Sequence, residues 1–190
     1  MQISINSTQI EHLTTLLKEK AFVLYDTLVE YGHDETEDLS YPPAIVLKPT
    51  SVSEISEIMR YCHAEKIPVT PAGARTGLSG GSLPIHGGVL LSMEKFNKIL
   101  KIDEKNHQVI SEPGVITQVL QDAVKEKGLF YPPDPASKGS CFIGGNVSEN
   151  SGGPKAVKYG VTKDYVLNLE VVLPTGEVIW TGANVLKNAT

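Results

Sequence analysis

The chain has 190 residues, a formal net charge of −5 at pH 7 and 41% hydrophobic residues. An acidic balance disfavours a protein built mainly to hold nucleic acid or an anionic membrane surface, and no apolar run approaches the length that a bilayer requires. The N-terminal sequence lacks the basic and apolar regions of a signal peptide, and the two cysteines are Cys62 and Cys141. We therefore expect the protein in the reducing cytoplasm, without a transmembrane segment.

The N-terminal residues predict one helix followed by a loop. Ser7 or Thr8 is expected to cap a helix whose apolar residues recur at helical spacing on one face. Residues 31–38 are polar and strongly acidic, and we expect them to form a solvated loop without a chemical role.

A β-α-β unit is predicted next. Residues 44–47 and 67–70 are each typical of a strand, and between them Ser51 and Glu54 form the pattern of a capping box ahead of an amphipathic helix. The second strand leads directly into a glycine-rich segment, residues 71–81.

The rest of the chain predicts a mixture of strands and helices, so the expected fold class is α+β. Thr117 is expected to cap a helix that Gly128 ends. Residues 169–180 predict a β-hairpin around Pro174-Thr175-Gly176. Other strand-like segments lie at residues 89–91, 99–102 and 108–111.

The first glycine-rich segment runs from Pro71 to Gly81 as Pro-Ala-Gly-Ala-Arg-Thr-Gly-Leu-Ser-Gly-Gly. Such small residues leave the backbone bare, so that successive N–H groups can point into one concavity and approach an anion closely. Side-chain donors would be added by Arg75, Thr76 and Ser79. The ligand that we expect in this concavity is a diphosphate. The spacing matches neither a Walker nor a Rossmann motif. A flexible turn between two strands is the alternative.

A second small and polar segment runs from Gly139 to Gly153. Two such segments in one domain favour a long ligand that lies extended between two lobes and is contacted by backbone along its length. A dinucleotide has that shape.

Taken in order, these motifs resemble the FAD-binding domain of the vanillyl-alcohol oxidase and para-cresol methylhydroxylase (PCMH) flavoproteins. Within that family, the sequence is similar to glycolate oxidase FAD subunits, D-lactate dehydrogenases and D-2-hydroxyglutarate dehydrogenases, from about residue 42 onward. The motifs that carry the resemblance are the segment 71–81, Glu112-Pro113-Gly114, Pro132-Pro133-Asp134-Pro135, the segment 139–153, Lys158-Tyr159-Gly160 and the terminal hairpin.

The resemblance implies a two-lobed α+β FAD-binding domain of the PCMH type that is truncated at its C-terminus. Residues 1–41 would then form an N-terminal helix and lead-in, residues 42–98 the first lobe, and residues 99–190 an incomplete second lobe. A substrate domain would be absent.

The resemblance also implies which residues hold the cofactor, with the first segment on the pyrophosphate and the second along the adenosine and the flavin. In the first segment these are Pro71, Gly73, Ala74, Arg75, Thr76, Gly77, Leu78, Ser79, Gly80 and Gly81. Beyond it they are Pro133, Asp134, Gly139, Ser140, Cys141, Gly144, Gly145, Asn146, Asn150, Gly152, Gly153 and Gly160. Many relatives have glycine or asparagine where this chain has Arg75, whose side chain either turns away from the phosphates or pairs with them. Relatives that attach flavin covalently often use a histidine in this loop, and since none is present we expect noncovalent FAD.

The function implied is the FAD-binding, N-terminal portion of a 2-hydroxyacid dehydrogenase or oxidase, in which a hydride passes from a small 2-hydroxyacid to flavin. We expect this portion alone to be inactive. Two alternatives stay open, namely a same-fold enzyme of other chemistry, such as an alkyl-glycerone-phosphate synthase, and a noncatalytic FAD-binding fragment.

The sequence assigns no catalytic residue and no electron acceptor, and it leaves a homo-oligomer open. The five histidines show no metal-ligand spacing, so a divalent metal is expected only in the absent substrate domain. We interpret Cys62 and Cys141 as packing residues.

Overall fold

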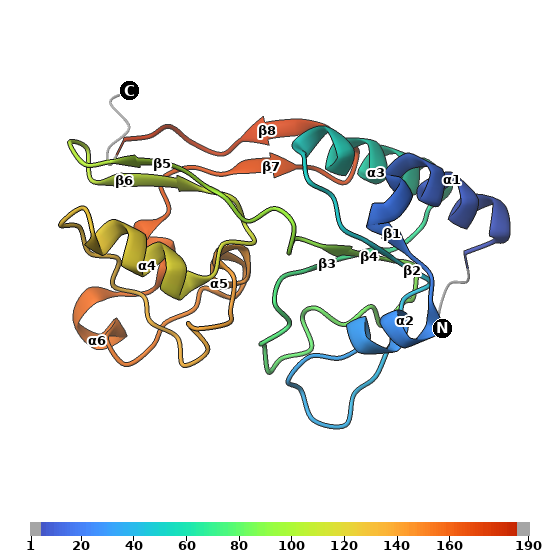
Figure 1. The fold of residues 1–190 in the computed structure, drawn as a ribbon, viewed down its shortest axis with the longest axis horizontal. Coiled ribbons are helices and arrows are strands. Elements are labelled where there is room, and N and C mark those ends of the chain that lie inside the picture. The colour runs from blue at the N-terminus through green and yellow to red at the C-terminus, as the bar shows by residue number, and fades with distance from the viewer. Residues whose placement is uncertain (1–4, 186–190) are drawn as a thin grey trace.

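A four-stranded sheet lies at the centre of the N-terminal half of the protein (Figure 1). The computed structural model describes residues 5–185. The strand order is β1-β2-β4-β3, in which β2, β4 and β3 are parallel and β1 pairs antiparallel with β2. The elements of this half are α1 (Ser7–Leu17), β1 (Ala21–Phe22), α2 (Tyr25–Tyr31), β2 (Ile45–Leu47), α3 (Val52–Glu65), β3 (Val69–Ala72) and β4 (Val89–Ser92).

Helices cover both faces of this sheet. Ile45 and Leu47 of β2 pack with α1 and α3 on one face, while Val46 packs with Tyr31 of α2 on the other. Figure 1 shows α1 and α3 on one side of the sheet and α2 on the other. Because both of their faces are buried, the parallel strands β2 and β4 have the continuous apolar sequences from which they are predicted.

The second half is built from two hairpins and short helices. Its elements are β5 (Ile99–Asp103), β6 (Gln108–Ser111), α4 (Thr117–Lys125), α5 (Ile143–Glu149), α6 (Ala156–Tyr159), β7 (Glu170–Val172) and β8 (Val178–Trp180). Strand β5 pairs with β6, and β7 with β8, both antiparallel. Val115, Leu120 and Val124 form the buried core beneath the β5–β6 hairpin. The chain also forms two 3₁₀ turns, Lys18–Lys20 and Thr162–Tyr165.

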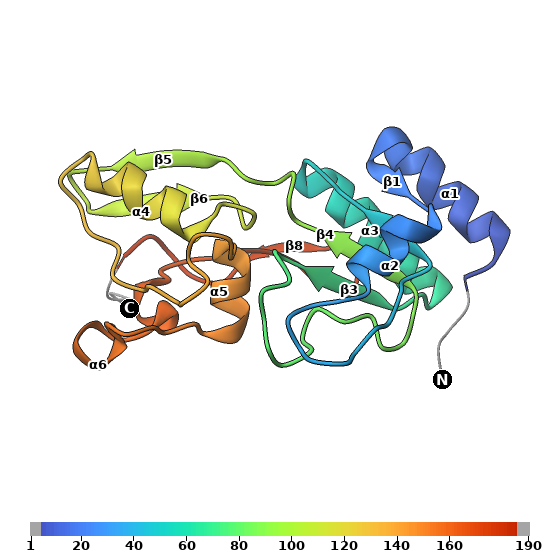
Figure 2. The same ribbon diagram turned by 60° about the horizontal axis from the view of Figure 1, so that its bottom comes forward.

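The β7–β8 hairpin connects the two halves, because it extends from the second half to α3 of the first (Figure 1 and Figure 2). The hydroxyl of Ser56 in α3 donates a hydrogen bond to the carbonyl oxygen of Gly176 in the hairpin turn at 2.5 Å. Gly176 has φ +82°, and a Cβ there would lie 2.6 Å from the Ser56 carbonyl oxygen. Both its backbone conformation and this close approach therefore require glycine.

The mixed architecture confirms the expected fold class, and the predicted strands at 44–47 and 89–91 and the terminal hairpin are confirmed. The helix after Ser51 is confirmed as well. The division into lobes at residue 98 stays a prediction. Within residues 5–185, no helix combines the length and the apolar character needed to cross a bilayer.

The predicted cap of the first helix is wrong by one residue. Neither Ser7 nor Thr8 caps α1; the side chain of Asn6 accepts a hydrogen bond from the Gln9 amide at 2.9 Å. Gln9 returns a hydrogen bond to the Asn6 amide, because the spacing of a capping box fits these two residues.

The other two predicted caps are confirmed only in part or not at all. Ser51 caps α3 as expected, but the capping box is not completed, because the Glu54 carboxylate accepts a hydrogen bond from the Thr50 amide. Thr117 caps nothing, since its side chain is buried and bonds to the Cys141 carbonyl oxygen at 3.3 Å.

Three helices were not expected from the sequence. Helix α2 lies before most of the acidic run, α5 lies inside the second glycine-rich segment, and α6 follows that segment. The Ile143–Glu149 backbone is helical despite Gly144 and Gly145, because tertiary packing outweighs the low helix propensity of glycine.

Removing the Ser56 hydroxyl tests whether the hairpin stabilises the junction of the halves. Ser56→Ala leaves the carbonyl oxygen of the buried Gly176 without its partner, so we expect a loss of about 1–3 kcal/mol in the free energy of unfolding. Urea unfolding followed by circular dichroism measures it. Ser53→Ala on the exposed face of the same helix is the control, and equal stabilities of the two variants would contradict this role of the hairpin.

Candidate functional site

The first two residues of the first glycine-rich segment, Pro71 and Ala72, end strand β3. The rest of the segment forms a loop at the carboxyl end of β3, at the edge where parallel strands present ligand sites in open α/β sheets. Among residues 5–185, no group accepts a hydrogen bond from the seven consecutive amides of residues 73–79. A run of free backbone N–H groups in a non-helical loop is the usual form of an anion-binding concavity. The loop therefore has the donors that its sequence predicts.

The acidic segment after α2 supports this loop. The amide of Glu35 donates to the Gly77 carbonyl oxygen at 3.1 Å, and the hydroxyl of Thr36 accepts from the Gly80 amide at 2.8 Å. The acidic run 31–38 is thus more than a solvated loop, because it fixes the far end of the glycine-rich segment.

Arg75 has a positive φ of +58°. Its guanidinium carbon lies 4.0 Å from the centroid of the Tyr31 ring, and one guanidinium nitrogen lies 3.6 Å from a carboxylate oxygen of Glu30. The Arg75 side chain is thus turned toward α2.

Tyr31 belongs to a polar cluster at the ends of β2 and β4. Lys48 Nζ lies 2.9 Å from Glu94 Oε1, and the Tyr31 hydroxyl donates to the other carboxylate oxygen of Glu94. Burial acts to raise the pKa of Glu94, but hydrogen bonds from Lys48 and Tyr31 outweigh it and lower the pKa below 4.5. Burial, and then the hydrogen bond to Glu94, raise the pKa of Tyr31 above 10.0. The cluster thus holds an ionised carboxylate and a neutral phenol.

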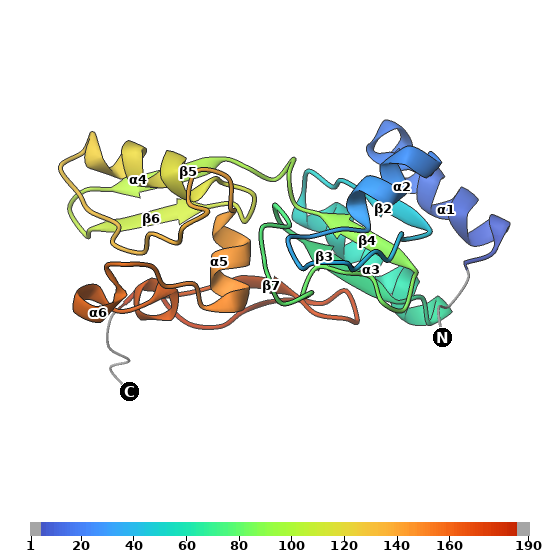
Figure 3. The ribbon, with the colours of Figure 1, turned by 90° about the horizontal axis from the view of Figure 1, so that it is seen from below.

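Helix α5 lies beside the first loop (Figure 3). A Cβ built on Gly73 would lie 3.7 Å from the Phe142 ring and 3.8 Å from the Gly145 nitrogen. At the other end of the loop, a Cβ on Gly81 would lie 2.8 Å from a carboxylate oxygen of Glu149. The fold therefore brings the two predicted glycine-rich segments together.

The two glycines at the start of α5 have different surroundings. A Cβ on Gly144 would lie 2.7 Å from Pro113 Cβ, so the packing of the helix requires glycine there. A Cβ on Gly145 would meet no atom within 4 Å, and the same holds for Gly77 and Gly139, none of which has a positive φ. The fold itself does not require glycine at these three positions.

Residues 133–134 and 152–155 form a second contact between predicted site segments. Asp134 is buried, and its carboxylate lies 3.2 Å from Lys155 Nζ and accepts from the Lys155 amide at 3.3 Å. Gly153 has φ +134°, and a Cβ there would clash with the Asp134 carbonyl oxygen. The Pro133 carbonyl oxygen accepts from the Gln121 side chain at 2.8 Å. The Asp134 side chain is thus occupied within the protein.

Two further predicted residues have buried side chains. Cys141 and Asn146 both contact the Thr117 hydroxyl, which lies 3.3 Å from Cys141 Sγ. Their side chains point into the core, in agreement with the interpretation of Cys141 as a packing residue. Burial also raises the pKa of the Cys62 thiol to about 12.

The remaining predicted residues lie at the surface or at turns. Gly139 and Ser140 are exposed, as are Pro71, Leu78 and Ser79. Asn150 ends α5 in the left-handed conformation and accepts from the Lys163 amide at 3.0 Å. The glycines at the other turns, with positive φ, are Gly80 and Gly160.

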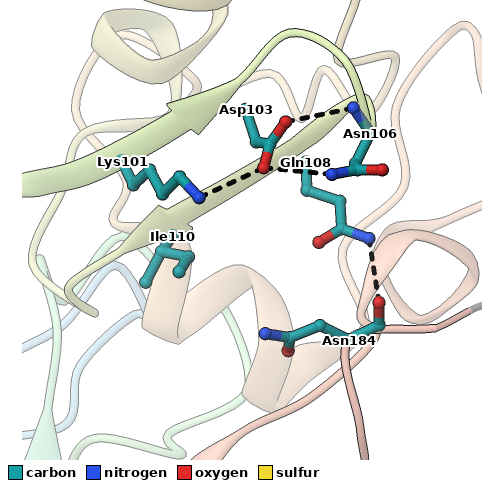
Figure 4. Close-up of a pocket in the computed structure, with 6 residues that line it drawn as sticks. All are labelled: Lys101, Asp103, Asn106, Gln108, Ile110 and Asn184. Atoms are coloured by element: carbon teal, nitrogen blue, oxygen red, sulfur yellow. Dashed lines mark hydrogen bonds and ion pairs between the residues drawn. The ribbon is translucent and has the colours of Figure 1, made fainter.

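A separate polar pocket of about 300 Å³ lies against the β5–β6 hairpin (Figure 4). Asp103 accepts from Lys101 and Asn106, and these hydrogen bonds, Asn106 first, lower its pKa to about 2. Gln108 donates to the Asn184 carbonyl oxygen at 3.0 Å. The polar groups of this pocket thus bond to one another, and none of the predicted site residues lines it. In residues 5–185, no three His, Cys, Asp or Glu side chains are grouped so as to hold a metal ion.

Comparison with known proteins matches residues 43–182 to a family described as FAD binding domain. The chain belongs to the FAD binding domain family. The resemblance inferred from the glycine-rich motifs is thereby confirmed, and FAD is the cofactor that this family membership supports.

Curated relatives of this FAD binding domain include a glycolate oxidase subunit and a D-lactate dehydrogenase. The chain is 46% identical over 158 residues to glycolate oxidase subunit GlcD of Bacillus subtilis, covering 83% of this chain and 34% of the relative. It is 41% identical to D-lactate dehydrogenase of Anaerostipes hadrus, covering 98% of this chain and 39% of the relative. The chain therefore spans little more than a third of the length of these relatives.

A solved structure shares the fold of this domain. The structure of p-cresol methylhydroxylase with substrate bound matches 91% of this chain and 34% of its own, with a TM-score of 0.78 and 26% identity. This confirms the PCMH-type fold predicted from the motifs.

Three residues of the site region were missed in the sequence, namely Tyr31, Lys48 and Glu94. Lys48 directly follows a predicted strand and Glu94 closely follows another, and polar residues at the carboxyl ends of parallel strands indicate a ligand-binding edge. Nothing in the sequence pointed to Tyr31 as a residue of this edge, because the helix that carries it was not predicted.

The polar cluster gives the protein a pH-dependent contribution to stability. A carboxylate with a lowered pKa in the folded state stabilises the fold above its unfolded-state pKa, and this contribution is lost as the pH falls through the folded-state pKa. Glu94→Gln should therefore reduce the free energy of unfolding by about 2 kcal/mol at pH 7, and the difference from the parent should shrink toward pH 3. Urea unfolding at a series of pH values measures it. A difference that stays constant from pH 7 to pH 3 would show that the charge of Glu94 is not responsible.

Proposed function

We propose that the loop 71–81 binds the pyrophosphate of FAD through its backbone. The observation that carries this proposal is the run of seven free amides at residues 73–79. A diphosphate offers oxygen acceptors to several neighbouring N–H groups at once, and small side chains allow the close approach that such bonds need. Arg75 contributes through its amide, since its guanidinium group is engaged by Tyr31 and Glu30.

The second segment would hold the adenosine and flavin portions of FAD. Gly145 and Gly139 support this, because each leaves open space where the fold would accept a side chain. Gly145 also lies beside Gly73 of the first loop, so one extended ligand can contact both segments. We assign Asp134, Cys141 and Asn146 the role of shaping this surface from within, because their side chains are buried.

We propose that FAD is bound without a covalent link. The loop 71–81 contains no histidine. The thiol of Cys141, in the second segment, is buried against Thr117 and is not presented at the surface. The protein would thus hold the cofactor through hydrogen bonds and packing alone.

For the whole protein we propose a dehydrogenase or oxidase of small 2-hydroxyacids in the cytoplasm. Glycolate and D-lactate, the compounds in the names of the two relatives, are both 2-hydroxyacids. Bound FAD would supply the hydride acceptor, and this domain would bind the cofactor and fix its orientation. A reducing compartment fits two cysteines that are both free and buried.

Cofactor binding is tested by incubating the purified protein with FAD and removing free FAD by gel filtration. We expect yellow protein, and we expect acid precipitation to release all of the colour into the supernatant. Colour that stays with the precipitate would contradict the noncovalent proposal, and colourless protein at FAD concentrations near 100 μM, well above ordinary cofactor affinities, would contradict the site.

Substrate oxidation is tested with the FAD-loaded product of the complete gene. Reduction of a dye by glycolate, D-lactate or D-2-hydroxyglutarate is expected. FAD binding without oxidation of any 2-hydroxyacid would instead favour a same-fold enzyme of other chemistry or a noncatalytic FAD-binding module.

A pair of neighbouring substitutions separates folding from cofactor binding. Gly145→Ala places a methyl group in open space within a helix, so it should raise the free energy of unfolding by about 0.5–1 kcal/mol while weakening FAD binding. Gly144→Ala should destabilise the fold, because its methyl group would clash with Pro113. Thermal unfolding and FAD titration measure the two effects. If the FAD affinity of Gly145→Ala equals that of the parent protein, Gly145 does not contact FAD and the proposed site excludes it.

A further inference from the structure

The first glycine-rich loop contains one large charged side chain, Arg75, at a position where its backbone favours glycine. Its φ of +58° lies in the left-handed region, which is unfavourable for a residue that carries a Cβ. A residue in such a conformation persists when its surroundings hold it there. The contacts of the Arg75 side chain therefore need an explanation.

These contacts join the loop to a rigid platform. The guanidinium group stacks on Tyr31, with 4.0 Å between its carbon and the ring centroid, and only 19% of the Arg75 side chain is exposed. Tyr31 is itself buried and is held by Glu94, which pairs with Lys48. Arg75 is thus linked through one aromatic ring to the ends of β2 and β4.

The chain that follows Tyr31 supplies two further attachments to the loop. Glu35 donates its amide to the Gly77 carbonyl oxygen, and Thr36 accepts from the Gly80 amide. Together with the stacked Arg75, these hydrogen bonds hold the loop at three points along its length. None of the three uses an amide of residues 73–79 as a donor.

We propose that Arg75 is a positioning residue, which fixes the free amides of the loop for their ligand by stacking on Tyr31 and does not itself contact the ligand. This rests on the proposed binding of the FAD pyrophosphate by the same loop. A loop that is ordered before binding loses less conformational entropy when the ligand arrives. The guanidinium group is instead engaged by Tyr31 and Glu30.

The proposal is tested first without any nucleotide. Arg75→Asn removes the guanidinium group but keeps a residue that tolerates the left-handed conformation. Lys66→Asn is the matched control, because Lys66 also has a left-handed backbone, with φ +56°, and lies at the end of α3 away from the loop. The amides of Gly80 and Glu35 donate the two hydrogen bonds that attach the loop, so their hydrogen exchange reports its order. We expect exchange at these two amides to be about tenfold faster in Arg75→Asn and unchanged in Lys66→Asn.

The ring of Tyr31 should matter in the same way. Tyr31→Leu removes the platform and keeps the charge of Arg75, so it should accelerate exchange at the same two amides. The double variant should add little to either single variant, since both remove one shared interaction. If Tyr31→Leu does not fold, as judged by circular dichroism, the comparison of Arg75→Asn with Lys66→Asn decides the outcome alone.

FAD titration at low and high salt distinguishes positioning from direct contact. A positioning role predicts that Arg75→Asn weakens binding about tenfold at both salt concentrations, because no charge contact with the diphosphate is lost. A direct contact would make the loss large at low salt and small at high salt, and this result would overturn the proposal. Exchange in Arg75→Asn as slow as in the parent would overturn it as well. If the parent protein binds no FAD while exchange in Arg75→Asn is accelerated, the proposed function fails and the fixing of the loop by Arg75 stands.

Discussion

Seven consecutive backbone amides, which have no partner among residues 5–185, impose the constraint on which the glycine-rich loop depends. A protein ordinarily pairs its backbone N–H groups, and a run that donates to nothing within the protein gains no order from its own hydrogen bonds. The shape of the loop 71–81 must therefore come from contacts on its other side. Those contacts are the Arg75 side chain, the Gly77 carbonyl oxygen and the Gly80 amide, all of which meet α2 or the segment after it.

The same constraint explains the position of the loop in the fold. The parallel strands β2, β4 and β3 end at one edge of the sheet, and the loop begins where β3 ends. Lys48 and Glu94 occupy the ends of the neighbouring strands, where they support Tyr31. The second half of the protein reaches this edge through α5 and is joined to α3 by the β7–β8 hairpin. A ligand at this edge would thus be approached from both halves.

An element could be predicted from the sequence wherever the local pattern of residues agrees with the final structure. The strand at β2 and the terminal hairpin follow from apolar runs and turn residues, and the two glycine-rich segments follow from composition. Helix α5 was missed because its glycines lower helix propensity, and its formation depends on packing against Pro113, a contact distant in sequence. The direction of the Arg75 side chain depends on Tyr31 in the same way. Such long-range contacts leave no local pattern from which to predict them.

The glycines themselves divide into two classes, and the second class supports the proposed cofactor-binding surface. Gly144 and Gly176 are required by the fold, since a side chain at either would meet neighbouring atoms of the protein. Gly77, Gly139 and Gly145 have ordinary dihedral angles and empty space around them, and glycine there lowers stability relative to alanine where the chain is helical, as at Gly145. A residue that costs stability and fills no structural need is explained when something outside the chain must approach the backbone closely. All three of these glycines lie in the two segments that the sequence assigns to the cofactor, so the packing of the protein and the chemistry of its sequence point to the same surface.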